Sequence, residues 1–564
     1  MKKILILALS AFLLVSVLTS CGGSEEETEL VTDESGDIDA SSASKGLRYA
    51  PLTEPTETTY GTCSLAGIGS CTDNNIIVPR YTEDGYEVIA LGEEAFKDTA
   101  TLVSIQLPSS VATIGDAAFS GCTNLKKINL PADLDAIGNE MFLNCVSLTE
   151  IDLPSRITQI GNKAFAGCTR LEEIVIPDRV TRIGAAAFAD CIRLSSAEFT
   201  ESYRPLALDA MTFKGCTALT AIVFPDNVTN IPQNCFAGCE SLVSVSIGEG
   251  VTSFGTGSFS DCSMLEEINI PEGITELPTD LFRGCARLPA FDIPATVTTI
   301  GDNTFYGCNA FVKMVVPDSV TTMGIGAFQN CLSLREITLG SGLTAIPEAA
   351  FLGCGDLISI AVPENCTEIG TMAFMGCNNL TAAIIGDKVQ SIGAMAFASC
   401  TNLTYAHIGA AVTLIDDRAF FGCSLLSFIR LTNETTIGNQ AFASCENLAY
   451  VIGNAATIGE GAFDRCDMLS AFYFGANLNT LEQKFTYGRV AAFNSNLHDI
   501  MYVYTETEPV PGEERGIYID DETGLYYTVR EIIPKTGAPY TITAYFHCFA
   551  ANGVPSPWYA TVAE

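Results

Sequence analysis

Cysteine is the residue type whose number and spacing most suggest chemistry, because the chain has 22 cysteines in 564 residues. Sixteen of them stand three residues after a phenylalanine, as Cys122 does after Phe119. A metal site needs cysteine or histidine side chains clustered a few residues apart. Only Cys235 and Cys239 approach that spacing, and Cys239 is one of the sixteen. The cysteine pattern therefore favours a structural repeat over a metal site.

Motifs that carry catalysis are missing from the sequence. The three histidines, His407, His498 and His547, match no metalloprotease pattern, and no phosphate-binding loop, nucleophile elbow or dinucleotide fingerprint occurs. Acidic pairs such as Asp416 and Asp417 are typical of solvated faces in a chain whose formal net charge is −37. We expect no catalytic site, no cofactor and no metal. The negative charge also argues against a nucleic-acid-binding protein.

The phenylalanines show the period of the repeat. They are 23 residues apart, except for one spacing of 25, one of 22 and one of 21. So regular a period over 17 copies predicts a solenoid, in which each coil buries its apolar face against its neighbours. The phenylalanines lie at positions 96, 119, 142, 165, 188, 213, 236, 259, 282, 305, 328, 351, 374, 397, 420, 442 and 463.

The residue types within one copy, such as "IGDAAFSGCTNLKKINLP" at 114–131, predict the elements of a coil. The alternating apolar residues at its end predict one short strand, which the proline ends because it cannot donate to a ladder. The Gly and the Ala-Phe pair predict a turn and a short helical or 3-10 piece. We therefore predict a β-rich solenoid of about 17 coils with phenylalanines and cysteines stacked inside.

The repeat cysteines are predicted to be buried free thiols. Parallel neighbours in a stack leave their Cβ atoms too far apart for good disulfide geometry. Whether Cys63 and Cys71, which precede the repeats, form a disulfide stays open.

The repeats and the entry segment "GIGSCTDNNIIVPRYTEDGYEVIALGEEAF" resemble the BspA-like leucine-rich repeat family of bacterial surface proteins. The resemblance covers about residues 60–474. It implies a leucine-rich repeat fold with the entry segment as an N-terminal cap coil. It also implies adhesion to host matrix proteins or to other bacteria. The coil at 199–213 has two extra residues and no Ile-Gly, which predicts a surface bulge.

The first residues have the pattern of an exported lipoprotein. Lys2 and Lys3 precede an apolar stretch at 4–18, which is too short to span a membrane and is typical of a signal peptide. The following "LTSC" resembles a bacterial lipobox, which implies that Cys21 is lipidated and becomes the mature N-terminus. The acidic segment behind it resembles a signal for the outer face of the outer membrane. We expect an exported outer-membrane lipoprotein, exposed at the cell surface and attached only through its lipid.

These signals divide the chain into five parts. The alternating segments "GLYYTVREII" and "YTITAYFHCFA" predict a small β-rich module after the repeat stops. Because the segment behind Cys21 is acidic and has little to bury, it is typical of a flexible stalk. The predicted parts are a signal peptide at 1–20, an acidic stalk at 21–59, an N-terminal cap coil at 60–95, the solenoid at 96–476 and a β-rich C-terminal module or cap at 477–564.

Strand residues that point away from the core form the candidate contact surface, and they stand five and seven residues after each repeat cysteine. In early coils several are charged, as Glu150 and Asp152 are. An exposed apolar strip marks an interaction site, unless the C-terminal module folds over it. In late coils these positions form such a strip, named here the late-coil strip: Ile384, Tyr405, His407, Phe428, Arg430, Tyr450, Ile452 and Tyr473.

The predicted function is non-catalytic adhesion by a monomeric surface protein that presents its solenoid to host matrix proteins or to other cells. Two alternatives stay open. The first is a carbohydrate-binding lipoprotein of a glycan-uptake system, in which the late aromatic residues stack on sugar rings. The second is a structural spacer without a ligand.

Overall fold

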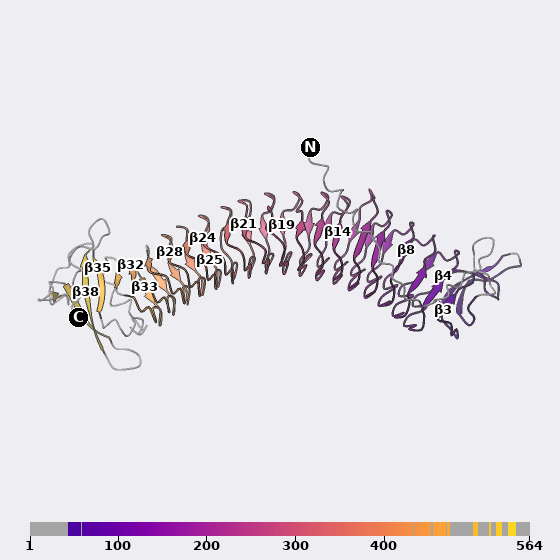
Figure 1. The fold of residues 1–564 in the computed structure, drawn as a ribbon, viewed down its shortest axis with the longest axis horizontal. Coiled ribbons are helices and arrows are strands. Elements are labelled where there is room, and N and C mark those ends of the chain that lie inside the picture. Colours follow the sequence, from indigo (N-terminus) through magenta and orange to yellow (C-terminus); the bar gives the residue numbers. More distant parts are fainter. Residues whose placement is uncertain are drawn as a thin grey trace, which may run out of the picture.

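The computed structural model describes residues 43–57, 59–431, 434–452, 455–469 and 471–473, and four strands between residues 500 and 548. The predicted signal peptide and Cys21 lie outside the described residues. The repeats stack into a long, curved solenoid, in which the chain advances by one coil at a time along the arch (Figure 1). In the described part of the chain, no helix has the length and apolarity needed to cross a membrane.

The first kind of strand, named here the main strand, lies five to seven residues after the repeat cysteine, as predicted. Main strands of neighbouring coils pair in parallel, with Ile105 opposite Ile128 in the first coils. The main strands are β3 (Asn75–Ile77), β5 (Ser104–Gln106), β7 (Lys127–Asn129), β10 (Glu173–Ile176), β12 (Ser196–Phe199), β14 (Ala221–Val223), β16 (Ser244–Ser246), β18 (Glu267–Ile268), β21 (Lys313–Val315), β23 (Glu336–Thr338), β24 (Ser359–Ala361), β26 (Ala382–Ile384), β28 (Tyr405–His407), β30 (Phe428–Arg430), β32 (Tyr450–Ile452) and β34 (Ala471–Tyr473).

A second strand in most coils goes beyond the one strand predicted. It is usually two residues long and ends on the buried isoleucine that precedes the repeat glycine, as at Ile137 and Ile160. A strand of two residues is too short to show an alternating pattern in the sequence. It forms only because it pairs with the equivalent segment of the neighbouring coil. These strands are β4 (Tyr86–Leu91), β6 (Thr113–Ile114), β8 (Ala136–Ile137), β9 (Gln159–Ile160), β11 (Arg182–Ile183), β13 (Ala207–Leu208), β15 (Asn230–Ile231), β17 (Ser253–Phe254), β19 (Glu276–Leu277), β20 (Thr299–Ile300), β22 (Thr322–Met323), β25 (Glu368–Ile369), β27 (Ser391–Ile392), β29 (Leu414–Ile415), β31 (Thr435–Ile437) and β33 (Ala455–Ile458).

The segment around each phenylalanine differs from the short helical or 3-10 piece that was predicted. It is a run of turns in the described coils, because residues on both sides of the phenylalanine have positive φ, such as Ala117 (54°) and Gly121 (74°). The backbone N–H of Phe119 donates to the carbonyl oxygen of Met141 at 2.9 Å, one coil further on. A helix would turn these N–H groups back on their own segment. Stacking gives them a partner in the next coil instead.

The predicted phenylalanine stack is confirmed. From Phe96 to Phe463, neighbouring rings lie with centroids 5.0–6.0 Å apart and planes within 26° of each other. Offset stacking of this kind adds roughly 0.5–1.5 kcal/mol per pair to the free energy of burial. The rings are fully buried, so they form the continuous core of the solenoid.

The predicted cysteine stack is also present, and every cysteine whose side chain the structure describes is a buried free thiol. Each repeat thiol donates to the phenylalanine carbonyl oxygen of the preceding coil, as Cys191 Sγ does to Phe165 at 3.1 Å. A small thiol fits this slot because it fills apolar space and still offers a donor to a buried carbonyl. Cys63 and Cys71 are both buried free thiols, so they do not pair in this structure.

The two ends of the solenoid are built differently. At the N-terminal end, β1 (Arg48–Thr53) pairs antiparallel with β2 (Gly61–Gly67), so part of the range predicted as stalk is strand. Leu47 is buried and Tyr49 packs against the core, which explains why the chain is ordered there. Beyond the last coil, the predicted β-rich module contains a sheet in the order β35-β38-β37-β36. Its strands are β35 (Ile500–Thr505), β36 (Tyr518–Ile519), β37 (Tyr526–Ile532) and β38 (Tyr540–Cys548).

Candidate binding surface

The late-coil strip lies on five successive main strands, β26, β28, β30, β32 and β34. Strand pairing places Ile384 beside His407 and Phe428 beside Tyr450. Each strand has a buried residue between its two outward ones, such as Ala406 on β28 and Ile429 on β30. This alternation follows from strand geometry, because successive side chains point to opposite faces.

The described side chains of the strip are open to solvent. Ile384, Tyr405 and Tyr450 are 51%, 49% and 46% exposed, and Phe428 is half-buried. His407 and Arg430 are exposed as well. Ile452 and Tyr473 lie on main strands, but their side chains are outside the described residues. The structure therefore brings together six described members of the strip on one face.

The strip carries no carboxylate, whereas several of the earlier main strands do. On the main strands from β24 to β32, none of the outward residues is acidic, although the chain has 66 acidic residues. Earlier main strands carry outward Glu173, Glu198 and Glu336. The strip instead carries Arg430 and His407, whose Nδ1 lies 3.2 Å from the carbonyl oxygen of Ile385. Since that carbonyl can only accept, Nδ1 carries the hydrogen in this contact.

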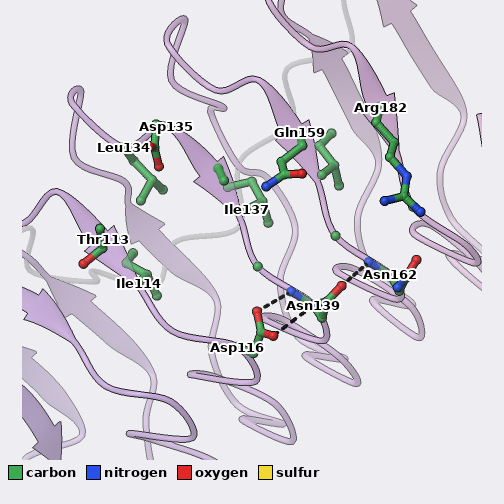
Figure 2. Close-up of a pocket in the computed structure, with 15 residues that line it drawn as sticks. Thr113, Ile114, Asp116, Leu134, Asp135, Ile137, Asn139, Gln159, Asn162 and Arg182 are labelled. Carbon is green, nitrogen blue, oxygen red and sulfur yellow. Dashed lines mark hydrogen bonds between the residues drawn. The ribbon is translucent and has the colours of Figure 1, made fainter. Parts of the chain in front are cut away.

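A hollow of ≈ 380 Å³ lies along the second strands of the early coils, away from the late-coil strip (Figure 2). Its polar groups bond to one another from coil to coil. Asn139 Nδ2 donates to Asp116 Oδ2 at 2.9 Å, and the N–H of Asn162 donates to Asn139 Oδ1 at 2.9 Å. Because these groups are already partnered, the hollow is better explained as part of the stacking than as a ligand site.

Catalytic chemistry has little support in the described residues. No three His, Cys, Asp or Glu side chains there are grouped as metal ligands would be. Burial raises the pKa of the Cys191 thiol to about 12, and that of Cys122 to about 12 as well. A nucleophilic or metal-binding cysteine needs the opposite shift, toward the thiolate. His498 and His547 lie outside the residues whose side chains are described.

The sequence argument treated the outward residues of the early coils as ordinary solvated surface, and two features there go beyond that expectation. Val175, Val223 and Val315 are 52%, 66% and 51% exposed on main strands outside the late-coil strip. They stand seven residues after their cysteines, so the spacing rule that gives the strip places them outward as well, but it does not give their exposure. The predicted bulge at 199–213 is confirmed, but the full exposure of Tyr203, at 103%, had no signal of its own.

Comparison with known proteins gives the same architecture. A family model described as "BspA type Leucine rich repeat region (6 copies)" matches residues 89–210, 206–312, 275–404 and 367–491. A leucine-rich repeat protein from Bacteroides ovatus is similar over 76% of this chain and 98% of its own, at 25% identity and a TM-score of 0.54. A leucine rich cell surface protein from Faecalibacterium prausnitzii is 28% identical over 63% of this chain and 94% of its own, with a TM-score of 0.40. No match was found among curated proteins.

The family matches run over most of the coils and cover more than half of the chain. The matched ranges include the stacked coils whose phenylalanines and cysteines form the core. The chain belongs to the BspA-type leucine-rich repeat family.

Proposed function

We propose that this protein is a non-catalytic binding protein of the bacterial surface and that the late-coil strip is its contact face. The observation that carries the proposal is an exposed apolar and aromatic strip without carboxylates, in a chain whose net charge is −37. Tyr and Arg are the residue types that most often anchor protein interfaces. The partners are surface proteins of host matrix or of other bacteria.

The test replaces Tyr405 and Phe428 with serine in the full chain carrying Cys21→Ser. Binding to plates coated with fibronectin, with fibrinogen and with bacterial cell-wall extract is then compared with the parent chain. The matched control replaces Lys313 and Val315 with serine, because these are the two outward residues of β21, a main strand outside the strip. The proposal predicts that the variant with both Tyr405 and Phe428 replaced loses binding, while its melting temperature stays equal to that of the parent chain. The control variant should bind as the parent does.

Two other results would contradict the proposal. A large drop in melting temperature for the Tyr405 and Phe428 pair would mean that the C-terminal module covers the strip. Equal binding by all three chains would mean that the strip contacts no partner.

A glycan ligand is the second candidate, because Tyr405, Phe428 and Tyr450 stand on successive main strands, where sugar rings can stack. A glycan array separates the two candidates. Sugar binding that quenches tyrosine fluorescence and disappears in Phe428→Ser supports the glycan candidate, whereas retention on matrix proteins alone supports adhesion.

We also propose that the protein is held on the outer membrane through a lipid on Cys21, at the cell surface. The support is the "LTSC" sequence after an apolar segment. The parent protein is expected to enter the detergent phase on phase separation, and the Cys21→Ser chain the aqueous phase. If both enter the aqueous phase, the lipid assignment fails.

A further inference from the structure

The early coils carry a second distinctive surface, at the bulge formed by residues 200–205. Tyr203 is 103% exposed at the tip of this bulge. The backbone beneath it is held from both neighbouring coils. Ser202 Oγ donates to the carbonyl oxygen of Asp178 at 2.6 Å, and Asn227 Nδ2 donates to the carbonyl oxygen of Arg204 at 2.5 Å. The residues on both sides of Tyr203 are therefore anchored to neighbouring coils, and its side chain extends into solvent.

A hollow of ≈ 320 Å³ lies beside the bulge on the outward face of the main strands. Thr200 lines it from the bulge, and Val175 lines it from β10 with 52% of its surface exposed. Val223, 66% exposed, lies on β14 beyond the next main strand. An exposed apolar surface fixed by the backbone is a feature of binding sites.

The charges around the hollow indicate what it would bind. Its carboxylates are those of Glu150, Asp152, Glu173 and Asp178. Glu150 pairs with Lys127 Nζ at 3.4 Å, whereas the other three form no ion pair within the described residues. Arg179 and Arg204 are close in sequence to the hollow but are not part of its lining. The lining itself is therefore acidic and partly apolar.

We infer that the hollow and Tyr203 form a second binding site, which takes a basic segment of a partner protein. Its carboxylates would accept the ammonium or guanidinium groups of lysine or arginine. Val175 and Tyr203 would cover the apolar stems of those side chains, and the Tyr203 ring also attracts a cation to its face. The site is separate from the late-coil strip and does not depend on it.

The test uses the full chain with Cys21→Ser and a short fluorescein-labelled peptide in which lysine alternates with valine. Fluorescence anisotropy measures binding at low salt, with the same peptide carrying glutamate in place of lysine as a comparison. The lysine peptide is expected to bind and the glutamate peptide is not. Val175→Ser combined with Tyr203→Ser is expected to weaken binding by about ten-fold, and Glu173→Gln by a few-fold.

The matched control combines Val315→Ser with Glu267→Gln. Val315 is 51% exposed, almost the same as Val175, and both control residues occupy outward positions of other coils. This control is expected to bind the lysine peptide as the parent does. Equal weakening in the control would show attraction to the overall negative charge and would overturn the site. Failure of the lysine peptide to bind the parent chain would overturn it as well.

Discussion

Alkaline pH is expected to destabilise this protein through its buried thiols. Burial raises the pKa of thirteen of the sixteen repeat cysteines above the ordinary value of 9.0. The native state therefore keeps its thiol protons at pH values where the unfolded chain releases them. The contribution to stability is complete below the ordinary pKa and is lost as pH rises toward the native pKa.

The magnitude can be worked out for Cys191, whose pKa is raised to about 12 and whose Sγ donates to Phe165. Between the ordinary pKa and about 12, each pH unit lowers the free energy of unfolding by about 1.4 kcal/mol for this thiol. Cys191→Ala removes the titrating group. The free energy of unfolding of this variant should therefore fall less steeply with pH, by up to about 1.4 kcal/mol per unit.

Urea unfolding followed by circular dichroism, at several pH values above neutrality and with reductant present, measures this slope. Ser195→Ala is the control, because Ser195 is an exposed, non-titrating residue of the same coil whose hydroxyl donates to the backbone carbonyl oxygen of Glu172. Its slope should equal that of the parent. If the Cys191→Ala slope also equals that of the parent, the thiol does not change its protonation on unfolding, and the buried cysteine stack is wrong.

Three further predictions follow from the core and the coil-to-coil contacts. Phe282→Ala should lower the free energy of unfolding by about 3–5 kcal/mol, because the ring is fully buried between stacked neighbours. Phe421→Ala, at a ring 37% exposed, should cost less than about 1 kcal/mol in the same urea titration. In the chain with Cys21→Ser and Cys548→Ser, a bulky thiol reagent should label only after unfolding, and fast labelling of several thiols would refute their burial. Asn139→Ala should cost about 1 kcal/mol by removing two contacts between coils, and an unchanged urea midpoint would show that these bonds add no stability.

Much of the core could be predicted from residue types and period alone. A single coil of about 23 residues is too small to bury its own phenylalanine. The coils must therefore stack, so that neighbouring coils cover each ring. The same argument places Cys122 and its equivalents inside. It also places Tyr405 outside and Ala406 inside, because strand alternation needs only the sequence offset from the cysteine.

The path of the backbone between the main strands was decided by tertiary structure. The segment around Phe119 contains residues that favour a helical turn, yet alternate N–H groups, such as those of Phe119 and Gly121, donate to the coil one repeat further along. The two-residue strand ending at Ile137 exists only because Ile160 lies beside it. Local residue propensity cannot predict either feature, because the backbone hydrogen-bond partner is one whole repeat away in the sequence.

The sequence by itself determined which side chains are buried, how many coils stack and which strand residues face solvent, because burial follows from residue type and periodicity. Only the tertiary structure decided how far each outward residue is exposed and which of them lie together. Tyr203 becomes fully exposed because Ser202 and Asn227 hold the bulge to the coils on either side. The hollow beside it depends on side chains from several coils, whose distances no single repeat encodes.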